Sequence, residues 1–253
     1  MKVISVVGYS KSGKTTTIET IIRELRKRNY RVGSIKDIHY EGFQIDTDGT
    51  NTDRHRKAGS ELVTARGLHE TDVLFSDRLD LYAMARFYDV DFLIVEGIRE
   101  ANTPIILTAD KIEDLDQRWS DHVFMVSGKI ADEIDEYRGM PAISVLQDPM
   151  ALVDRIEETA FDLLPDFPAT CCTACGGTCR ELCAAILRGE RERKDCVLDQ
   201  AQVRLSVNDQ QIPMVPFVQN ILRNAVLGVV KELEGSQDDA KITIEIGPSW
   251  QQK

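Results

Sequence analysis

The chain has 253 residues, and its 42% hydrophobic content supports buried cores. This length allows two modest domains of about 100–200 residues each. A formal net charge of −11 argues against nucleic acid as the main partner, because binding to a phosphate backbone needs a basic surface. No apolar run approaches the ~20 residues that a membrane span needs. No cleavable signal pattern precedes the first predicted strand, so we expect a cytoplasmic protein with no membrane partner.

A phosphate-binding loop is predicted at the start of the chain. Residues 8–15, Gly-Tyr-Ser-Lys-Ser-Gly-Lys-Thr, match the pattern G-x-x-x-x-G-K-[ST] at every fixed position. The loop follows an apolar run over 3–7, which is typical of a buried parallel strand. It precedes 16–28, where isoleucine and leucine recur at helical spacing. This context separates the loop from an ordinary glycine turn, and it predicts that the chain binds a nucleoside triphosphate.

The residue types of this loop suit a triphosphate. Glycines let successive backbone N–H groups and the helix N-terminus face the phosphates. Lys14 would reach the β- and γ-phosphates, and the Thr15 hydroxyl would complete a Mg²⁺ shell. The predicted phosphate-binding residues are Gly8, Ser10, Lys11, Ser12, Gly13, Lys14, Thr15 and Thr16.

Strand-like and helical stretches alternate up to about residue 165. The predicted strands are 32–35, 92–95, 105–107, 123–126 and 143–146, and the predicted helices include 77–87 and 151–164. Such alternation indicates an α/β domain with a mainly parallel sheet. Ligands in such sheets bind beyond the carboxyl ends of the strands. A polar loop is expected between residues 41 and 51.

Two acidic residues join Lys14 as candidates for the catalytic centre. Glu96 lies at the carboxyl end of a predicted strand, where a carboxylate can bind Mg²⁺ or polarise the attacking water. A strand that ends in a solvated acid is the alternative. Asp37 follows the second predicted strand and could contact metal. The basic cluster 54–57 is either a solvated helix start or an anion-binding site.

These segments resemble the family of molybdopterin-guanine dinucleotide biosynthesis protein B, a family of P-loop GTPase-type proteins. The resemblance covers roughly the first 165 residues. The family usually has histidines where this chain has Asp37 and Tyr40, and it has Gly-Lys-Asp-Ser at 49–52 and a lysine at Ile105. The matching residues are 8–17, 35–36, His39, Phe43, Asp46, Gly49, Arg56, 58–59, Asp91 and 93–97.

The resemblance implies that the chain binds and slowly hydrolyses GTP with Mg²⁺. It would assist the attachment of a guanosine nucleotide to the pterin of the molybdenum or tungsten cofactor, which makes molybdopterin a candidate ligand. The transfer itself would belong to a partner nucleotidyltransferase, and molybdenum or tungsten apoenzymes are further candidate partners. The family also implies a homodimer, and loop 41–52 would close as a switch. Guanine specificity rests on resemblance alone, because 127–129 shows no Asn-Lys-x-Asp pattern.

All six cysteines lie between residues 171 and 196. In a reducing cytosol such crowding suggests metal ligation more than disulfides. The spacing Cys172-x2-Cys175-x3-Cys179-x16-Cys196 predicts the ligands of an iron–sulfur cluster, of the 4Fe-4S type. A structural zinc site and a metal-free redox switch are the alternatives.

The cysteine segment also resembles the small four-cysteine iron–sulfur domain of electron-transfer and corrinoid proteins. The shared residues include 175–176, 179–181, 189–190 and Cys196, and a helix is predicted over 180–188. That family leaves four residues between its second and third cysteines, whereas this chain leaves three. Cys171 and Cys183 could therefore replace a ligand.

The sequence thus predicts three parts: a P-loop domain (1–165), an iron–sulfur segment (170–200) and a small α+β tail (201–247). Residues 164–168 are expected to form a linker. In the tail we expect strands near 203–207 and 242–246, and a helix over 216–233 whose apolar face forms a core. The predicted function is that of a GTP-binding accessory protein with an iron–sulfur module that reports redox state or docks a partner. The alternative is a nucleotide-gated, metallochaperone-like protein or electron carrier.

Overall fold

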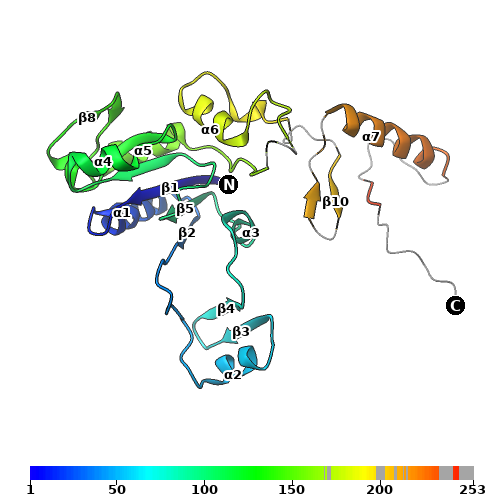
Figure 1. Cartoon of the computed structure of the whole chain (residues 1–253), viewed down its shortest axis with the longest axis horizontal. Helices are drawn as coiled ribbons and strands as arrows, with labels where there is room; N and C mark the ends of the chain where they lie inside the picture. The colour runs from blue at the N-terminus through cyan, green and yellow to red at the C-terminus, as the bar shows by residue number, and fades with distance from the viewer. Residues whose placement is uncertain are drawn as a thin grey trace.

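A five-stranded parallel sheet forms the centre of the computed structural model (Figure 1), in the order β2-β5-β1-β6-β7. Its strands are β1 (Lys2–Gly8), β2 (Val32–Lys36), β5 (Phe92–Glu96), β6 (Ile105–Thr108) and β7 (Val123–Ser127). The structure describes residues 1–167, 169, 172–197, 203–207, 210–212, 214, 216–233 and 242–244. The predicted α/β class with a mainly parallel sheet is confirmed.

The inner strands are continuous apolar runs because helices cover both faces of the sheet. Every residue of β5, β6 and β7 is buried. Helices α1 (Lys14–Lys27) and α5 (Pro149–Thr159) pack on one face, and α3 (Leu81–Ala85) and α4 (Ile112–Arg118) pack on the other. Strand β1 contacts both layers, since successive side chains point to opposite faces: Ile4 and Val6 face α1, and Val3 and Val7 face the second layer.

The strand predicted at 143–146 is wrong. Only Ala142 forms a bridge, to Val126, and the chain then turns. The Ser144 hydroxyl accepts hydrogen bonds from the backbone N–H groups of Leu146 and Gln147. A side chain that bonds its own backbone in this way favours a turn over a strand.

Two predicted helices are shorter than expected. Helix α3 covers only five residues of the predicted 77–87, because the Asp80 side chain caps it by accepting from the N–H of Ala83 at 2.7 Å. Helix α5 ends at Thr159 rather than at residue 164. The chain beyond it is extended, and Asp162 bridges to Lys2 at the start of β1.

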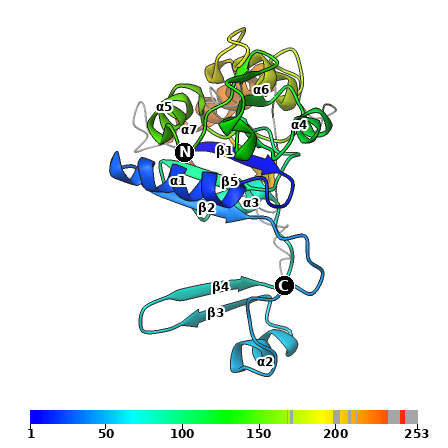
Figure 2. The same ribbon diagram turned by 90° about the vertical axis from the view of Figure 1, so that its left-hand side faces the viewer.

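An arm projects from the core between β2 and α3 (Figure 2). It consists of α2 (Asn51–Lys57) and an antiparallel hairpin of β3 (Leu62–Arg66) and β4 (Thr71–Phe75), which the sequence analysis did not predict. The basic cluster 54–57 ends α2 instead of starting it. Cations at a helix C-terminus interact favourably with the helix dipole. In the part of the chain that the structure describes, β3 and β4 pair only with each other.

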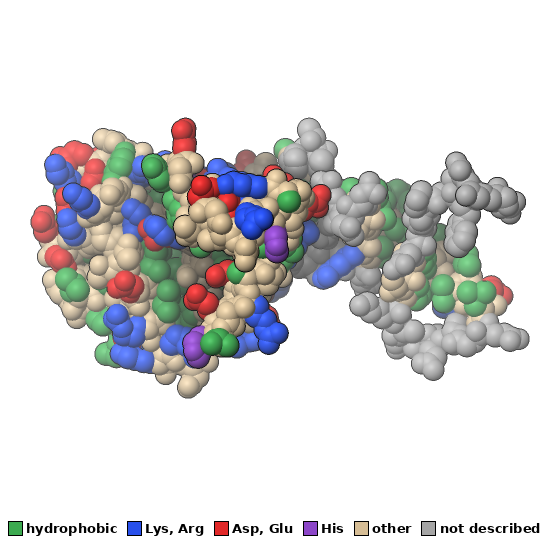
Figure 3. Space-filling model, turned by 90° about the horizontal axis from the view of Figure 1, so that it is seen from below, with side chains coloured by type: hydrophobic (Ala, Val, Ile, Leu, Met, Phe, Trp, Pro, Cys, Tyr) green, Lys and Arg blue, Asp and Glu red, His purple; other side chains and the backbone are tan. Residues whose placement is uncertain are grey.

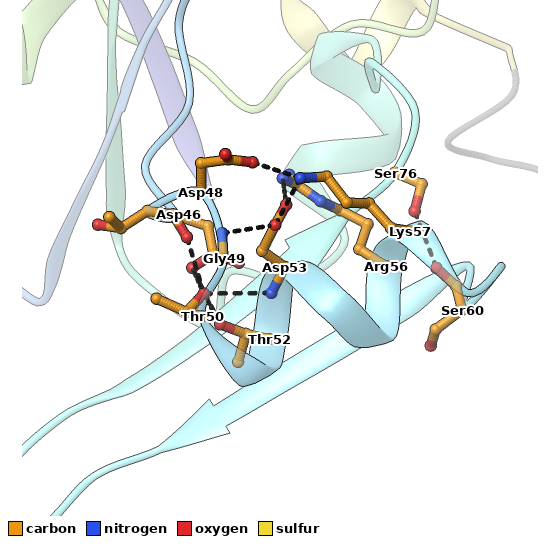
Figure 4. Close-up of polar contacts among 11 residues, drawn as sticks. Asp46, Asp48, Gly49, Thr50, Thr52, Asp53, Arg56, Lys57, Ser60 and Ser76 are labelled. Carbon is orange, nitrogen blue, oxygen red and sulfur yellow. Dashed lines mark hydrogen bonds and ion pairs between the residues drawn. The ribbon is translucent and has the colours of Figure 1, made fainter.

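A buried carboxylate joins the loop before α2 to the helix itself (Figure 4). Asp53 is only 1% exposed; it accepts hydrogen bonds from the Gly49 N–H at 2.9 Å and from the Lys57 ammonium at 2.7 Å. The hydrogen bond from Lys57, with those from Gly49 and Arg56, lowers the pKa of Asp53 to about 2. Asp46 accepts from the hydroxyls of two threonines at 2.8 and 2.9 Å. This network fixes the polar loop on the arm.

The cysteine segment contains α6 (Cys179–Leu187), as predicted to within a residue. A capping box fixes its start, in which the Thr178 hydroxyl accepts from the Glu181 N–H and the Glu181 carboxylate accepts from the Thr178 N–H. The segment packs near the amino ends of the sheet strands. His122, which precedes β7, donates from Nε2 to the carbonyl oxygen of Arg180 at 3.0 Å.

The residues expected to form a linker are docked on the core instead. Leu164 is fully buried with Leu182, Cys183 and Cys196. The side-chain amide of Asn102, which is 2% exposed, donates to the Pro165 carbonyl at 2.9 Å and to Asp166 at 3.0 Å. Pro168 lies outside the described residues.

The tail begins with a short hairpin of β10 (Leu205–Val207) and β11 (Gln210–Ile212), followed by α7 (Pro216–Val230). The predicted apolar face of α7 is partly exposed: Leu222, Val226 and Val230 are half-buried, whereas Phe217 is 73% exposed, Ile221 54% and Val229 65%. Residues 242–244 are not in a strand, and Ile246 lies outside the described residues.

The remaining elements are short. They are β8 (Glu136–Tyr137), β9 (Met140–Pro141) and the 3₁₀ turns η1 (Lys129–Asp132) and η2 (Arg193–Asp195). No helix among the described residues is both long and apolar enough to span a bilayer. Acidic and basic side chains are interspersed on the face shown in Figure 3.

Candidate functional site

The predicted phosphate loop turns between the carboxyl end of β1 and the first residue of α1. Gly13 caps the helix with a φ of 100°, a left-handed conformation that favours glycine. The Lys14 ammonium donates to the carbonyl oxygens of Gly8 at 3.0 Å and of Tyr9 at 2.5 Å, so it lies over the loop. Four of the predicted phosphate-binding residues are exposed at this turn: Ser10, Lys11, Thr15 and Thr16.

Two loops from other strands support the phosphate loop from behind. The hydroxyls of Ser12 and Thr108 are 2.7 Å apart and both residues are buried; Thr108 also donates to the Val7 carbonyl at 3.2 Å. The Lys129 N–H donates to the Ser12 carbonyl at 3.2 Å. A Cβ on Gly128 would lie 2.2 Å from that same carbonyl oxygen, so only glycine fits there. The ends of β6 and β7 therefore position the loop.

Glu96 lies where the sequence predicts it, at the carboxyl end of the strand next to β1. Its side chain is nearly buried and accepts from the Lys36 ammonium at 2.6 Å. The pairing follows from the register of the sheet, in which Lys36 lies opposite Glu96. The alternative of a solvated acid does not describe this residue, since its side chain is only 10% exposed.

Asp37 is one residue beyond the end of β2, and its side chain is also mostly buried. The Arg78 guanidinium donates to its two carboxylate oxygens at 3.2 and 3.3 Å, and His39 lies 3.4 Å from it. Asp37 and Glu96 lie at the carboxyl ends of the paired strands β2 and β5, and each already has a basic partner.

The electrostatic surroundings of Lys14 contain charges of both signs, and the carboxylate of Glu96 has the largest effect among them. Burial lowers the pKa of Lys14, and the cations Lys36 and Arg118 lower it further, whereas Glu96 opposes the change. Cations crowded in this way repel one another, and a bound anion would relieve the repulsion. Lys14, Lys36 and Arg118 thus bring positive charge to the loop.

A broad cleft of about 1840 Å³ opens beside Asp37. It is lined by the arm, by α3 and by residues 163–167. Aromatic side chains and guanidinium groups share its surface. They include Tyr40, Phe75, Tyr82, Arg78, Arg86 and Arg193.

Cys183 is the most deeply buried of the cysteines that the structure describes. Cys183 is fully buried among Leu164, Leu182 and Cys196, and this burial raises the pKa of its thiol to about 12. Burial also raises the pKa of Cys179, and the nearby thiols of Cys196, Cys172 and Cys175 add to the increase.

The four cysteines of the predicted set are therefore neighbours. They are not already arranged as ligands, since no group of three or more potential metal ligands forms among the described residues. The cysteines of this segment that the structure describes are free thiols. Cys171 lies outside the described residues.

Three residues at the phosphate loop were not predicted from the sequence. Thr108 had a usable signal, because a polar residue that ends an apolar strand resembles the pattern that identified Glu96. Gly128 was noted only as part of 127–129. For Arg118 the sequence offered no signal of this kind.

The fold and the loop define an α/β protein of the P-loop nucleoside-triphosphatase class. The family model for molybdopterin guanine dinucleotide synthesis protein B matches residues 3–124. A relative from Methanocaldococcus jannaschii, described as a putative molybdopterin-guanine dinucleotide biosynthesis adapter protein, is 30% identical over 259 residues, which cover 98% of this chain and 99% of the relative. The chain therefore belongs to the family of molybdopterin guanine dinucleotide synthesis protein B.

Two comparisons with Bacillus subtilis cover the first part of the chain. A probable molybdopterin-guanine dinucleotide biosynthesis adapter protein is 27% identical over 154 residues, which cover 59% of this chain and 88% of the relative. The crystal structure of Bacillus subtilis MobB shares the fold, with a TM-score of 0.53 and 23% identity over 64% of this chain and 99% of that one. The archaeal match also extends through the cysteine segment and the tail.

Proposed function

We propose that this protein binds GTP and acts as an accessory, slowly hydrolysing GTPase in the synthesis of the guanylylated molybdenum or tungsten pterin cofactor. The observation that carries the proposal is the phosphate loop, with Lys14 over the carbonyls of Gly8 and Tyr9 and Glu96 at the end of the adjacent strand. The archaeal and bacterial relatives are described as adapter proteins of molybdopterin-guanine dinucleotide biosynthesis, and these descriptions support a role in the synthesis of this cofactor.

The proposed roles follow from position. The backbone of the loop (Gly8 and Ser10 to Thr16) cradles the phosphates, and Lys14 exchanges its carbonyl acceptors for phosphate oxygens. Thr15 and Glu96 hold Mg²⁺, which neutralises phosphate charge. Glu96 has to exchange its bond to the Lys36 ammonium for the metal, and Asp37 orients water at the same edge.

Binding of GTP tests this proposal most directly. Lys14→Ala is expected to weaken GTP binding in the presence of Mg²⁺ by at least about tenfold, because a charge-assisted contact is lost. The matched control is Lys27→Ala on the last turn of the same helix, whose ammonium pairs with Glu24. Calorimetry with GTP and ATP would settle both affinity and base preference. Wild-type protein that binds neither nucleotide would refute the proposal.

A measurement of GTP turnover distinguishes this function from the alternative, a nucleotide-gated carrier. Repeated GTP hydrolysis that a nucleotidyltransferase of cofactor synthesis stimulates is the expected result. Tight one-to-one binding with no turnover would instead indicate a nucleotide-gated carrier, such as a metallochaperone or an electron-transfer protein.

We also propose that residues 170–200 form an iron–sulfur module, separate from the P-loop domain (1–165) and the tail (201–247). Cys172, Cys175, Cys179 and Cys196 are the ligands, because they are neighbours and lie on a loop, at a helix start and beyond a 3₁₀ turn. Thiolates favour such clusters. The four sulfurs would have to move closer together around the metal, since they are not arranged as ligands already.

The burial of Cys183 supplies a matched control for the metal site. Cys175→Ser is expected to lose iron, whereas Cys183→Ala is expected to keep it and lose only stability. Protein purified without oxygen should be brown and contain iron and sulfide. Zinc in place of iron would show a structural zinc site, and no metal in either form would refute the module.

The partners are proposed from exposed surfaces. The β3–β4 hairpin carries Leu62, Leu68 and Val73, which are 49%, 96% and 51% exposed, and edges that do not pair in the described part of the chain. Unpaired edges favour strand addition, so we propose that the arm forms a homodimer. Sedimentation of wild type and Val73→Asp tests this. The nucleotidyltransferase and molybdenum or tungsten apoenzymes remain the other partners.

Molybdopterin is the ligand that we propose for the cleft beside Asp37. Its aromatic walls suit a planar pterin, and its arginines suit a phosphate. Arg86→Ala should weaken binding of the pterin cofactor without changing GTP binding. An unchanged affinity would place the pterin elsewhere.

A further inference from the structure

Helix α4 contacts the phosphate loop through its last turn. The Arg118 guanidinium lies 3.9 Å from the centroid of the Tyr9 ring, and the Tyr9 hydroxyl donates to the Gln117 side chain at 2.7 Å. Tyr9 is the second residue of the loop, and its carbonyl accepts from Lys14. Arg118 thus packs on the side chain of Tyr9, the residue whose carbonyl the Lys14 ammonium contacts.

Arg118 has no acidic partner among the residues that the structure describes, although acidic residues outnumber basic ones by 42 to 31 in the chain. Its Nε is buried and has no hydrogen-bond acceptor within the described structure. An unpaired buried polar group of this kind calls for a specific explanation, such as an ion or ligand.

The stacked geometry leaves Arg118 free to bind an anion. A guanidinium that rests on an aromatic ring uses its face, so the N–H groups around its edge remain available for an oxyanion. The charge of Arg118 also affects Lys14. Burial lowers the pKa of Lys14 most, and Arg118 is one of two cations that lower it further.

We propose that Arg118 is a second triphosphate-binding cation, which donates from its edge to the γ-phosphate of the nucleotide held by Lys14. The proposal rests on the proposed function, because it needs a nucleoside triphosphate in the loop. Tyr9 holds the guanidinium in place, and Gln117 holds Tyr9. A cation at the γ-phosphate also stabilises the charge that develops during hydrolysis, so Arg118 contributes to turnover as well as to affinity.

The test compares a non-hydrolysable GTP analogue with GDP in full-length protein. Arg118→Ala is expected to weaken binding of the analogue by about tenfold and that of GDP by less than about twofold, because only the analogue has the contacted phosphate. Arg118→Lys keeps the charge but not the planar fork, so it should recover part of the affinity. Thermal unfolding of each variant checks that it folds.

Arg138 provides the matched control. Its guanidinium also lies over an aromatic ring, 5.4 Å from the centroid of Trp119, but Asp116 pairs with it at 2.6 Å. Arg138→Ala should therefore bind the analogue as wild type does. Analogue binding that is unchanged in Arg118→Ala overturns the inference alone, as does an equal loss of analogue and GDP. Wild-type protein that binds neither overturns the proposed function and this inference with it.

Discussion

At the scale of single residues, the phosphate loop depends on side chains that belong to other strands. Thr108 ends β6 and bonds both the Ser12 hydroxyl and the Val7 carbonyl. Gly128 follows β7 and lets the backbone approach the Ser12 carbonyl. The motif specifies the residues of the loop, and these contacts hold the loop in place.

Thr108→Val should destabilise the protein and weaken GTP binding. The variant leaves the buried Ser12 hydroxyl without its partner, which costs about 1–3 kcal/mol. Thr108→Ser restores the hydroxyl and should recover most of both losses. Urea unfolding and calorimetry measure the two effects. Wild-type values in the valine variant would show that the contact does not matter.

Gly128→Ala tests the close approach at the loop. Gly128 and Gly139 have φ angles of 80° and 79°, a range that L side chains rarely adopt, so alanine is strained at either position. Only at Gly128 does the new Cβ collide with the Ser12 carbonyl, whereas nothing lies within 4 Å at Gly139. GTP affinity should fall in Gly128→Ala and stay unchanged in Gly139→Ala. An equal response of the two variants would contradict the steric argument.

At the scale of elements, the arm is a small unit that cannot rely on a large core. A two-stranded hairpin is at best marginally stable alone, and here α2 packs against β3. The bonds from Asp53 to Gly49, Arg56 and Lys57 compensate by tying helix and loop together.

Acid should loosen the arm before it unfolds the core. The pKa of Asp53 is about 2, below the value of about 3.9 for an unfolded chain, so the charged carboxylate stabilises the arm above about pH 4. That stabilisation is lost as the pH falls toward 2. Amide exchange of α2, followed by NMR across this range, should show the loss. Asp53→Asn should be loose at every pH, and a pH-independent wild-type arm would be evidence against the network.

At the scale of the whole molecule, the two proposed sites lie at opposite ends of the sheet. The phosphate loop follows the last residue of β1, whereas the cysteine segment contacts His122, which precedes β7. Asn102, which precedes β6, bonds the carbonyl of Pro165 just before that segment. Strand β1 alone separates these ends by about 20 Å, at ~3.3 Å per residue. Any coupling of cluster oxidation to GTP hydrolysis must therefore pass through the packed core.

The contact between the core and the cysteine segment should weaken below neutral pH. His122 is 1% exposed, and its burial lowers its pKa. The hydrogen bond to the Arg180 carbonyl opposes this change, the charge of Arg180 adds to it, and Asp121 favours the charged form. The unfolded chain then takes up a proton first, near pH 6.5, so stability decreases as the pH falls from about 7. Urea midpoints at two pH values should shift less in His122→Gln than in wild type. The exposed His69→Gln is the control, and equal shifts in all three proteins would refute the prediction.

The strands and helices that border the loop could be predicted because their signals are local. An apolar run, a glycine turn and a helical repeat lie next to one another in 3–28. The arm hairpin was missed because its strands are short and largely exposed, so they lack an apolar run. The α7 face was expected to pack because its apolar residues recur at helical spacing. Such spacing does not show whether another element is present to cover the face.

The sequence by itself determined the parallel α/β core, the phosphate-loop motif and the clustering of cysteines, because each depends on residues close together in the chain. Tertiary structure alone decided that Thr108 lies behind Ser12, that Lys36 pairs with Glu96, and that Arg118 reaches the loop. It also buried Cys183 away from solvent while keeping the other four described cysteines near one another. Such pairings depend on strand order and register, which distant residues fix together and which no local pattern records.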